Sequence, residues 1–145
     1  MSIHGGDIYR NHVDIDFSIN VNPLGTPECV KTALHKAVEM CGEYPDMEAE
    51  RLREAISTFL GVPKEYLIFG NGASELFMAI VHGIKPGKVV IPVPSFYGYE
   101  YAAKAAGGEI IYYEMKRENS FCPGEDIDAV LAEDVQLLFL ANPNN

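Results

Sequence analysis

The chain has 145 residues, of which 48% are nonpolar and 22% are charged, and this is the composition of a globular protein rather than a disordered one. Its 11 Lys and Arg against 21 Asp and Glu give a formal charge of −10, which argues against a nucleic-acid or anionic-membrane partner. Because no nonpolar run approaches the ~18 residues that span a bilayer and the N-terminus lacks a signal-peptide pattern, we expect a cytoplasmic protein.

The first half of the sequence predicts an arm and two helices. Residues 1–28 are rich in Asn, Gly and Pro and have no clear periodicity, which predicts an arm without a long helix or strand. From Glu28 to Cys41, nonpolar residues recur on one face of a helix. A second helix follows, with Asp46 as its cap and Gly61 at its end. Its predicted inner face consists of Leu52, Ala55, Ile56, Phe59 and Leu60.

The second half alternates between predicted strands and helices. The predicted strands are 66–69, 88–93, 109–115 and 136–141, and the predicted helices are 74–84, 99–106 and 127–131. This alternation is typical of an α/β fold with a mainly parallel sheet flanked by helices. The runs VVIPV and LLFLA are continuously nonpolar, as expected of strands buried on both faces. Pro92 removes one ladder donor and suggests that its strand ends there.

The three cysteines are Cys29, Cys41 and Cys122. Their number is odd, they are widely spaced, and the sequence lacks the CxxC and HxxxH spacings of common metal sites. We therefore expect buried free thiols and no metal site.

The segment IFGNGASE, residues 68–75, can bind phosphate. A hydrophobic run leads through Gly70, Asn71 and Gly72 directly into a helix, so backbone N–H groups and the positive end of the helix dipole converge. The segment is not a P-loop, and Glu75 stands where a GxGxxG motif requires its third glycine. A simple tight turn with Ser74 as helix cap is the alternative, and the sequence leaves both open.

Two further segments follow predicted strands, where open parallel sheets bind their ligands. In PVPSFYGYE, residues 92–100, and just after it, aromatic rings can stack on a planar ligand or can pack the loop against the core. In ANPNN, residues 141–145, Asn side chains can bind a ligand oxygen or form a turn around Pro143. The rings in question are Phe96, Tyr97, Tyr99 and Tyr101.

The arm carries the segments HGGD, residues 4–7, and DFSINVNPLG, residues 16–25. His4 can contact an anionic group, and its two following glycines would let a ligand approach the backbone closely. The alternative is a solvated His near a chain end.

In this order, these segments resemble the N-terminal part of pyridoxal-phosphate-dependent, aminotransferase-like enzymes of fold type I, class I/II. Within that family they resemble the branch of threonine-phosphate decarboxylases and histidinol-phosphate aminotransferases. YPD at residues 44–46, GNGASE and NPNN are shared across the branch, whereas HGGD and FSINVNPLG favour the decarboxylases. The resemblance implies that residues 1–45 form the arm and a small-domain helix, and that residues 46–145 form an incomplete, cofactor-binding large domain.

The resemblance also implies a role for individual residues in binding pyridoxal 5'-phosphate. Gly72, Ala73 and Ser74 would donate to the cofactor phosphate. Phe96 would stack on the pyridine ring, and Asn145 would bond the phenolic oxygen of that ring.

For the substrate, the resemblance implies that Asn20 binds the carboxylate, with His4 and Gly5 near the phosphate. The family's Schiff-base Lys, ring-pairing Asp and substrate-binding Arg residues have no counterpart among these 145 residues, so we expect the chain alone to be inactive and assign no catalytic residue to it.

The expected parent protein is a homodimeric enzyme of phosphorylated amino acids or amines in cobalamin biosynthesis, an L-threonine-O-3-phosphate decarboxylase and thus a lyase. The first alternative is a histidinol-phosphate aminotransferase or related transferase. An alternative of another class is a noncatalytic fragment or a phosphate-binding α/β module, because the Schiff-base lysine is absent.

Overall fold

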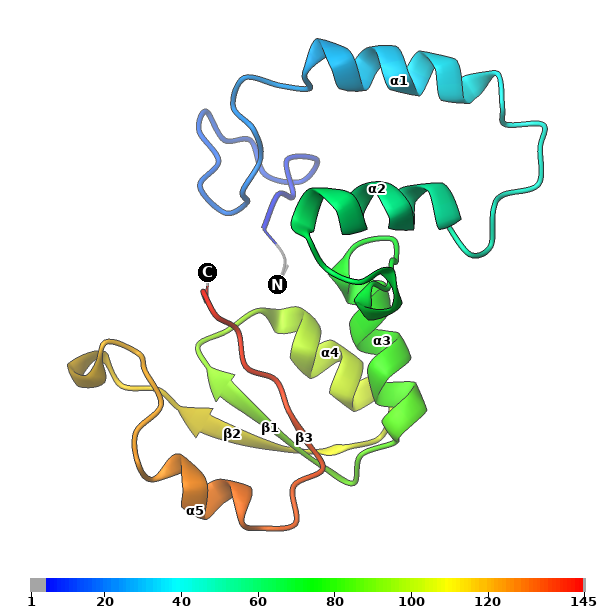
Figure 1. Cartoon of the computed structure of the whole chain (residues 1–145). Coiled ribbons are helices and arrows are strands. Elements are labelled where there is room, and N and C mark those ends of the chain that lie inside the picture. Colours follow the sequence, from blue (N-terminus) through cyan, green and yellow to red (C-terminus); the bar gives the residue numbers. More distant parts are fainter. Residues whose placement is uncertain (1–4, 145) are drawn as a thin grey trace. The chain divides into compact units, whose positions relative to one another are not determined.

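The computed structural model describes residues 5–144 (Figure 1). Its contacts divide the chain into two compact units, Met1–Leu67 and Ile68–Asn145, and each is described by itself. The division after residue 45 into parts of a small and a large domain stays a prediction about the intact enzyme.

The first unit contains the arm, two α-helices and a short 3-10 helix. Residues 5–27 form only turns, bends and irregular backbone, as the sequence predicts. Helix α1 spans Glu28–Val38 and begins directly after Pro27. It ends earlier than predicted because the N–H groups of Met40 and Cys41 donate three residues back, in turns rather than in a continuing α-helix.

Asp46, the predicted cap, lies one turn ahead of helix α2, which spans Glu50–Leu60. Its carboxylate accepts hydrogen bonds from the N–H of Glu48 at 3.1 Å and of Glu50 at 2.8 Å. Gly61 ends the helix in the left-handed conformation at φ 66°, and its N–H donates to the carbonyl of Ser57. The stop signal at Gly61 is thus confirmed. Asp46 bonds to the first residue of the helix but is not its N-cap, which is Ala49 in the left-handed conformation.

The predicted strand at 66–69 is wrong. Lys64–Tyr66 forms the 3-10 helix η1, and residues 67–69 belong to no strand, although Leu67 has an extended backbone at φ −107° and ψ 131°. The carbonyl of Leu67 accepts a hydrogen bond from the guanidinium of Arg53. An extended segment becomes a strand only when it forms backbone hydrogen bonds with a neighbouring strand. Here the side chain of Arg53 bonds the Leu67 carbonyl instead.

The second unit is a three-stranded parallel sheet with the order β2-β1-β3 (Figure 1). Helices α3 and α4 lie on one face of the sheet, and α5 lies on the other. This confirms the α/β class. In chain order the elements are α3 (Ala73–Ile84), β1 (Lys88–Val93), α4 (Tyr97–Ala105), β2 (Glu109–Glu114), the 3-10 helix η2 (Arg117–Asn119), α5 (Ile127–Leu131) and β3 (Leu137–Leu138).

Pro92 does not end strand β1, which continues to Val93 with Pro92 opposite Tyr113. The hydrogen bonds explain why. The Val93 carbonyl accepts from β2's side and the Val90 carbonyl from β3's side, so alternate residues serve opposite neighbours. Pro92 lies two residues after Val90, so its backbone also faces β3. The pairing with β3 ends at Val90 and Leu138, before it reaches Pro92. Its missing donor therefore costs no ladder bond.

The core lies where β1 meets α3 and α4. Val89, Val90 and Ile91 are at most 1% exposed, which confirms that VVIPV is buried on both faces. The segment LLFLA differs, because β3 is only two residues long and Leu140 is 57% exposed. The prediction of burial on both faces is therefore wrong for this segment, in which Phe139 alone is buried and Leu137 and Leu138 are half-buried.

The cysteines are free but exposed, so the prediction that they are buried is wrong. Cys29 lies on α1, where no residue is buried. A nonpolar helix face is buried only where another surface covers it, and the sequence pattern cannot supply that surface. Among residues 5–144, no helix is long and nonpolar enough to cross a membrane.

Candidate functional site

The turn before α3 has the geometry that the sequence predicts for a phosphate cradle. Gly72 precedes the helix at φ 77° and ψ 168°, a conformation that side-chain-bearing residues rarely adopt. Its N–H donates to the carbonyl of Gly70 at 2.8 Å. The N–H groups of the helix's first turn have no acceptor within the helix, and the positive end of the helix dipole lies at the same place. Ala73 and Ser74 thus present their N–H groups at the end of the turn.

Glu75, and not Ser74, closes this turn. Its Oε2 accepts a hydrogen bond from the Asn71 N–H at 2.5 Å, an arrangement close to a capping box. A Cβ added to Gly70 would lie 2.9 Å from Cδ2 of Leu76 and 3.1 Å from Oε2 of Glu75, so the loop is folded tightly onto the first turn. The sequence pattern identifies Glu75 only as a departure from GxGxxG. Its position three residues after Gly72 was the signal for a capping role.

The aromatic residues after β1 divide into two kinds. Tyr99 packs against the core, since its ring stacks on Phe139 at a centroid distance of 4.9 Å and meets Phe77 edge-on at 4.9 Å. Phe96 is 40% exposed, and its ring centroid lies 6.4 Å from that of Phe77. Because Phe77 follows Ala73 by about one turn of α3, the structure brings Phe96 to the helix that begins at the cradle.

Gly98 makes room for the ring of Phe96. A Cβ at this position would lie 2.2 Å from Cε1 and 2.9 Å from Cδ1 of Phe96. The sequence analysis missed this contact. A glycine within the first turn of α4, where it lowers helix propensity, was the available signal.

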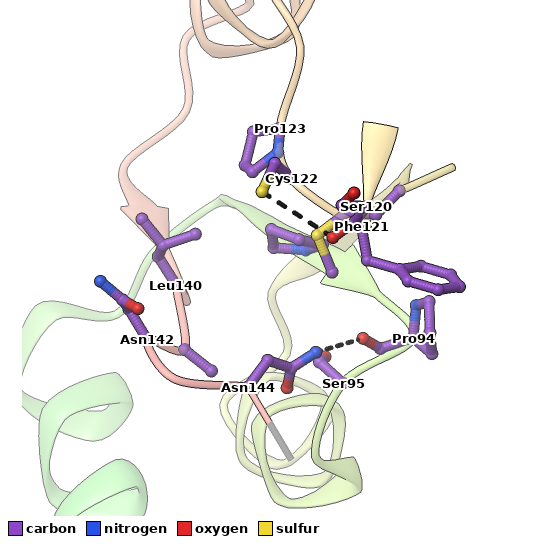
Figure 2. A pocket seen from close by; sticks show the side chains of 12 residues that line it. Pro94, Ser95, Ser120, Phe121, Cys122, Pro123, Leu140, Asn142 and Asn144 are labelled. Carbon is purple, nitrogen blue, oxygen red and sulfur yellow. Dashed lines mark hydrogen bonds between the residues drawn. The ribbon is translucent and has the colours of Figure 1, made fainter. Parts of the chain in front are cut away.

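The carboxyl ends of the strands bring PVPSFYGYE and ANPNN together. The Asn144 side-chain amide donates to the Pro94 carbonyl at 2.8 Å (Figure 2). A cavity of about 610 Å³ lies at this edge, and Leu140 and Cys122 are among the residues that line it (Figure 2). Asn145 lies outside the described residues, directly after Asn144.

The arm uses its two glycines to pack against itself. A Cβ on Gly5 would lie 2.3 Å from the Ser18 carbonyl oxygen, and the Gly6 N–H donates to Ser18 Oγ at 2.8 Å. Ser18 Oγ in turn donates to Asp16 at 2.5 Å. This hydrogen bond, together with one from the Ser18 backbone N–H, holds the pKa of Asp16 below its ordinary value. The close approach expected for a ligand at Gly5 is thus made by the chain itself.

The other predicted arm residues have different outcomes. His4 lies outside the described residues. Asn20 is exposed, and it belongs with Gly5 to the first unit, whereas Gly72, Ala73, Ser74 and Phe96 belong to the second. Within residues 5–144, no group of three or more His, Cys, Asp or Glu side chains is placed to hold a metal ion.

Two curated relatives match almost the whole chain. A protein of Caldanaerobacter subterraneus subsp. tengcongensis, provisionally named a threonine-phosphate decarboxylase, is 42% identical over 143 residues, which are 98% of this chain and 38% of that protein. The threonine-phosphate decarboxylase of Salmonella typhimurium is 32% identical over 152 residues, covering 99% of this chain and 42% of the relative. The chain thus spans about two fifths of the length of these relatives.

A solved structure and a family model extend the comparison. The crystal structure of the histidinol-phosphate aminotransferase from Clostridium acetobutylicum matches 88% of this chain and 37% of its own, with a TM-score of 0.71 and 29% identity. The model of the family described as aminotransferase class I and II matches residues 13–145, which is most of the chain. The chain therefore belongs to the class I and II aminotransferase family.

Proposed function

We propose that this sequence is the N-terminal part of a pyridoxal-phosphate-dependent enzyme that decarboxylates L-threonine O-3-phosphate. The observation that carries the proposal is the turn at Gly72, which combines a glycine at positive φ with the N-terminal N–H groups of α3 in a member of an aminotransferase family. The 42% identity to a provisional threonine-phosphate decarboxylase supports the choice of reaction.

The residues of the turn suit the phosphate of the cofactor. The backbone N–H groups of Ala73 and Ser74, with the Ser74 hydroxyl, form a donor set for a dianion at the positive end of a helix. At Gly72, the space around an added Cβ is empty to 4 Å, which leaves room for phosphate oxygens. Phe96 would lie against the pyridine ring, and Asn145 would donate to the phenolic oxygen.

When bound, pyridoxal phosphate supplies an electron sink for the carbanion formed when a bond at the substrate Cα breaks. The residues of this chain would decide how the two molecules are held. Asn20 would orient the substrate carboxylate, while His4 and Gly5 would lie near its phosphate. Which bond breaks depends on this orientation, so the arm would select decarboxylation over amino transfer.

Histidinol-phosphate aminotransferase is the second candidate. The observation that favours it is the structural likeness to the enzyme from Clostridium acetobutylicum, at 29% identity. The decarboxylase is preferred because the segments HGGD and FSINVNPLG, which distinguish the two within the branch, resemble the decarboxylases.

The proposal also covers partners and location. The intact enzyme would be a cytoplasmic homodimer that binds a small phosphorylated substrate, without a nucleic-acid or membrane partner. Within these 145 residues, the formal charge of −10 supports the last part, because such surfaces require an excess of Lys and Arg.

The test assays an intact enzyme that carries this sequence with both substrates. We expect release of CO₂ from L-threonine O-3-phosphate, and little amino transfer from histidinol phosphate to 2-oxoglutarate. Replacing Ser74 by Ala serves as control, since it should weaken cofactor binding without changing which reaction occurs. Rapid transamination of histidinol phosphate would contradict the decarboxylase assignment.

A further inference from the structure

We propose that Glu75 is a positioning residue of the phosphate cradle. Its carboxylate holds the loop from Gly70 to Gly72 in the conformation that turns the N–H groups of Ala73 and Ser74 toward the cofactor phosphate. The inference rests on the proposed function, because it takes the N-terminus of α3 as the phosphate site.

The hydrogen bonds of the loop carry the inference. The Asn71 N–H donates to Glu75 Oε2 at 2.5 Å, and the Gly72 N–H donates to the Gly70 carbonyl at 2.8 Å. Both N–H groups just before the helix thus have acceptors within the segment. Because Glu75 accepts the hydrogen bond of the Asn71 N–H, the donors left for a ligand are the N–H groups of the first helical turn.

The packing of Gly70 shows that this arrangement is tight. An added Cβ there would lie within 3.1 Å of both Leu76 and Glu75 Oε2, so the backbone of the loop rests on the side chain that bonds it. Loss of the carboxylate removes both the acceptor and the contact. We therefore expect the loop to lose its fixed conformation when the side chain is shortened.

A second role for Glu75 would have the opposite effect on the affinity for phosphate. A carboxylate in the first turn interacts favourably with the helix dipole and repels a phosphate. If this repulsion dominated, removing the carboxylate would tighten phosphate binding. Gln keeps an acceptor oxygen without the charge, whereas Asp keeps the charge on a side chain one methylene too short to preserve the bond. The two variants separate the two roles.

The experiment uses the intact enzyme in wild-type, E75A, E75Q and E75D forms, with E28A as control. Glu28 is also an acidic first-turn residue, but it lies on α1 and pairs with Lys31. Dissociation constants are measured by absorbance for pyridoxal phosphate and for pyridoxal, which lacks the phosphate. We expect E75A and E75D to weaken pyridoxal phosphate binding about tenfold, or ~1.4 kcal/mol, whereas E75Q and E28A stay within about threefold of wild type.

Pyridoxal binding should change little in any variant, because it does not use the cradle. An E75A affinity for pyridoxal phosphate equal to or tighter than that of wild type would overturn the inference. So would a loss in E75Q as large as in E75A, or an equal loss for pyridoxal. If E75A does not fold, the affinities of E75D and E75Q for pyridoxal phosphate are compared instead, and binding in E75D that is no weaker than in E75Q would overturn the inference. A wild-type enzyme that binds pyridoxal phosphate no tighter than pyridoxal would instead contradict the proposed function itself.

Discussion

The two units of the chain are stabilised in different ways. In the second unit, β1 lies between two strands and beneath α3 and α4, and its side chains form a buried core. In the first unit, α1 and α2 are amphipathic, yet neither contains a buried residue. A buried core therefore stabilises the second unit, whereas hydrogen bonds between exposed or partly buried residues stabilise the first.

The hydrogen bonds show the same contrast. In the first unit, the hydrogen bonds of Asp46, Ser18 and Arg53 join residues that lie two to 14 positions apart. In the second unit, β1 pairs with residues about 20 and about 48 positions away. Substitutions in β1 should therefore affect the whole sheet, and substitutions in α2 should have local effects.

The largest expected effect is that of Ile91→Ala. Ile91 is 1% exposed at the centre of the sheet, and truncation of a buried Ile costs ~2–5 kcal/mol. Leu52→Ala on α2 is the matched control, because Leu52 is 49% exposed and its loss should cost less than about 1 kcal/mol. Urea unfolding followed by far-UV circular dichroism measures both. Equal losses would show that the two units do not differ as described.

Two glycines of the second unit should respond in opposite directions. Gly98→Ala forces the Phe96 ring to move and should destabilise the protein by ~1–3 kcal/mol. Gly83→Ala within α3 meets no atom within 4 Å and should stabilise the protein by ~0.5–1 kcal/mol through its helix propensity. Thermal unfolding of both variants checks the signs. A stabilising Gly98→Ala would mean that the Phe96 ring does not rest on Gly98.

The smallest expected effect concerns Asp16 in the arm. Because hydrogen bonds from Ser18 lower the pKa of Asp16, its contribution to stability is present above the ordinary carboxyl pKa and is lost as the pH falls through the lowered value. Ser18→Ala should return the pKa of Asp16 toward its ordinary value. An NMR titration of the Asp16 carboxyl in the wild type and in the variant measures this directly. An unchanged pKa for Asp16 in the variant would place the cause elsewhere.

The sequence predicted elements that depend on local patterns. The bounds of β1 match their prediction, and α5 coincides with the predicted core of a helix, because a continuous nonpolar run and a helical period are complete within the two segments. The strand at 66–69 was wrong because strand formation requires a neighbour, and here Arg53 bonds the Leu67 carbonyl instead. The burial predicted for the cysteines failed for a related reason, since burial depends on a covering surface.

In the candidate site, too, the sequence predicted local backbone geometry but not contacts between side chains. Its backbone geometry at Gly72 followed from a glycine between a nonpolar run and a helix. The contact of Gly98 with Phe96 and the bond from Asn71 to Glu75 depend on side-chain conformations, which spacing alone does not determine. Sequence reasoning therefore predicted the backbone turn of the candidate site but missed two residues that shape it.

The most direct test is the crystal structure of an intact enzyme carrying this sequence, bound to pyridoxal phosphate. The account predicts phosphate oxygens about 2.7–3.2 Å from the backbone nitrogens of Ala73 and Ser74, with the ring of Phe96 against the pyridine ring. A phosphate held away from the N-terminus of α3 would contradict it.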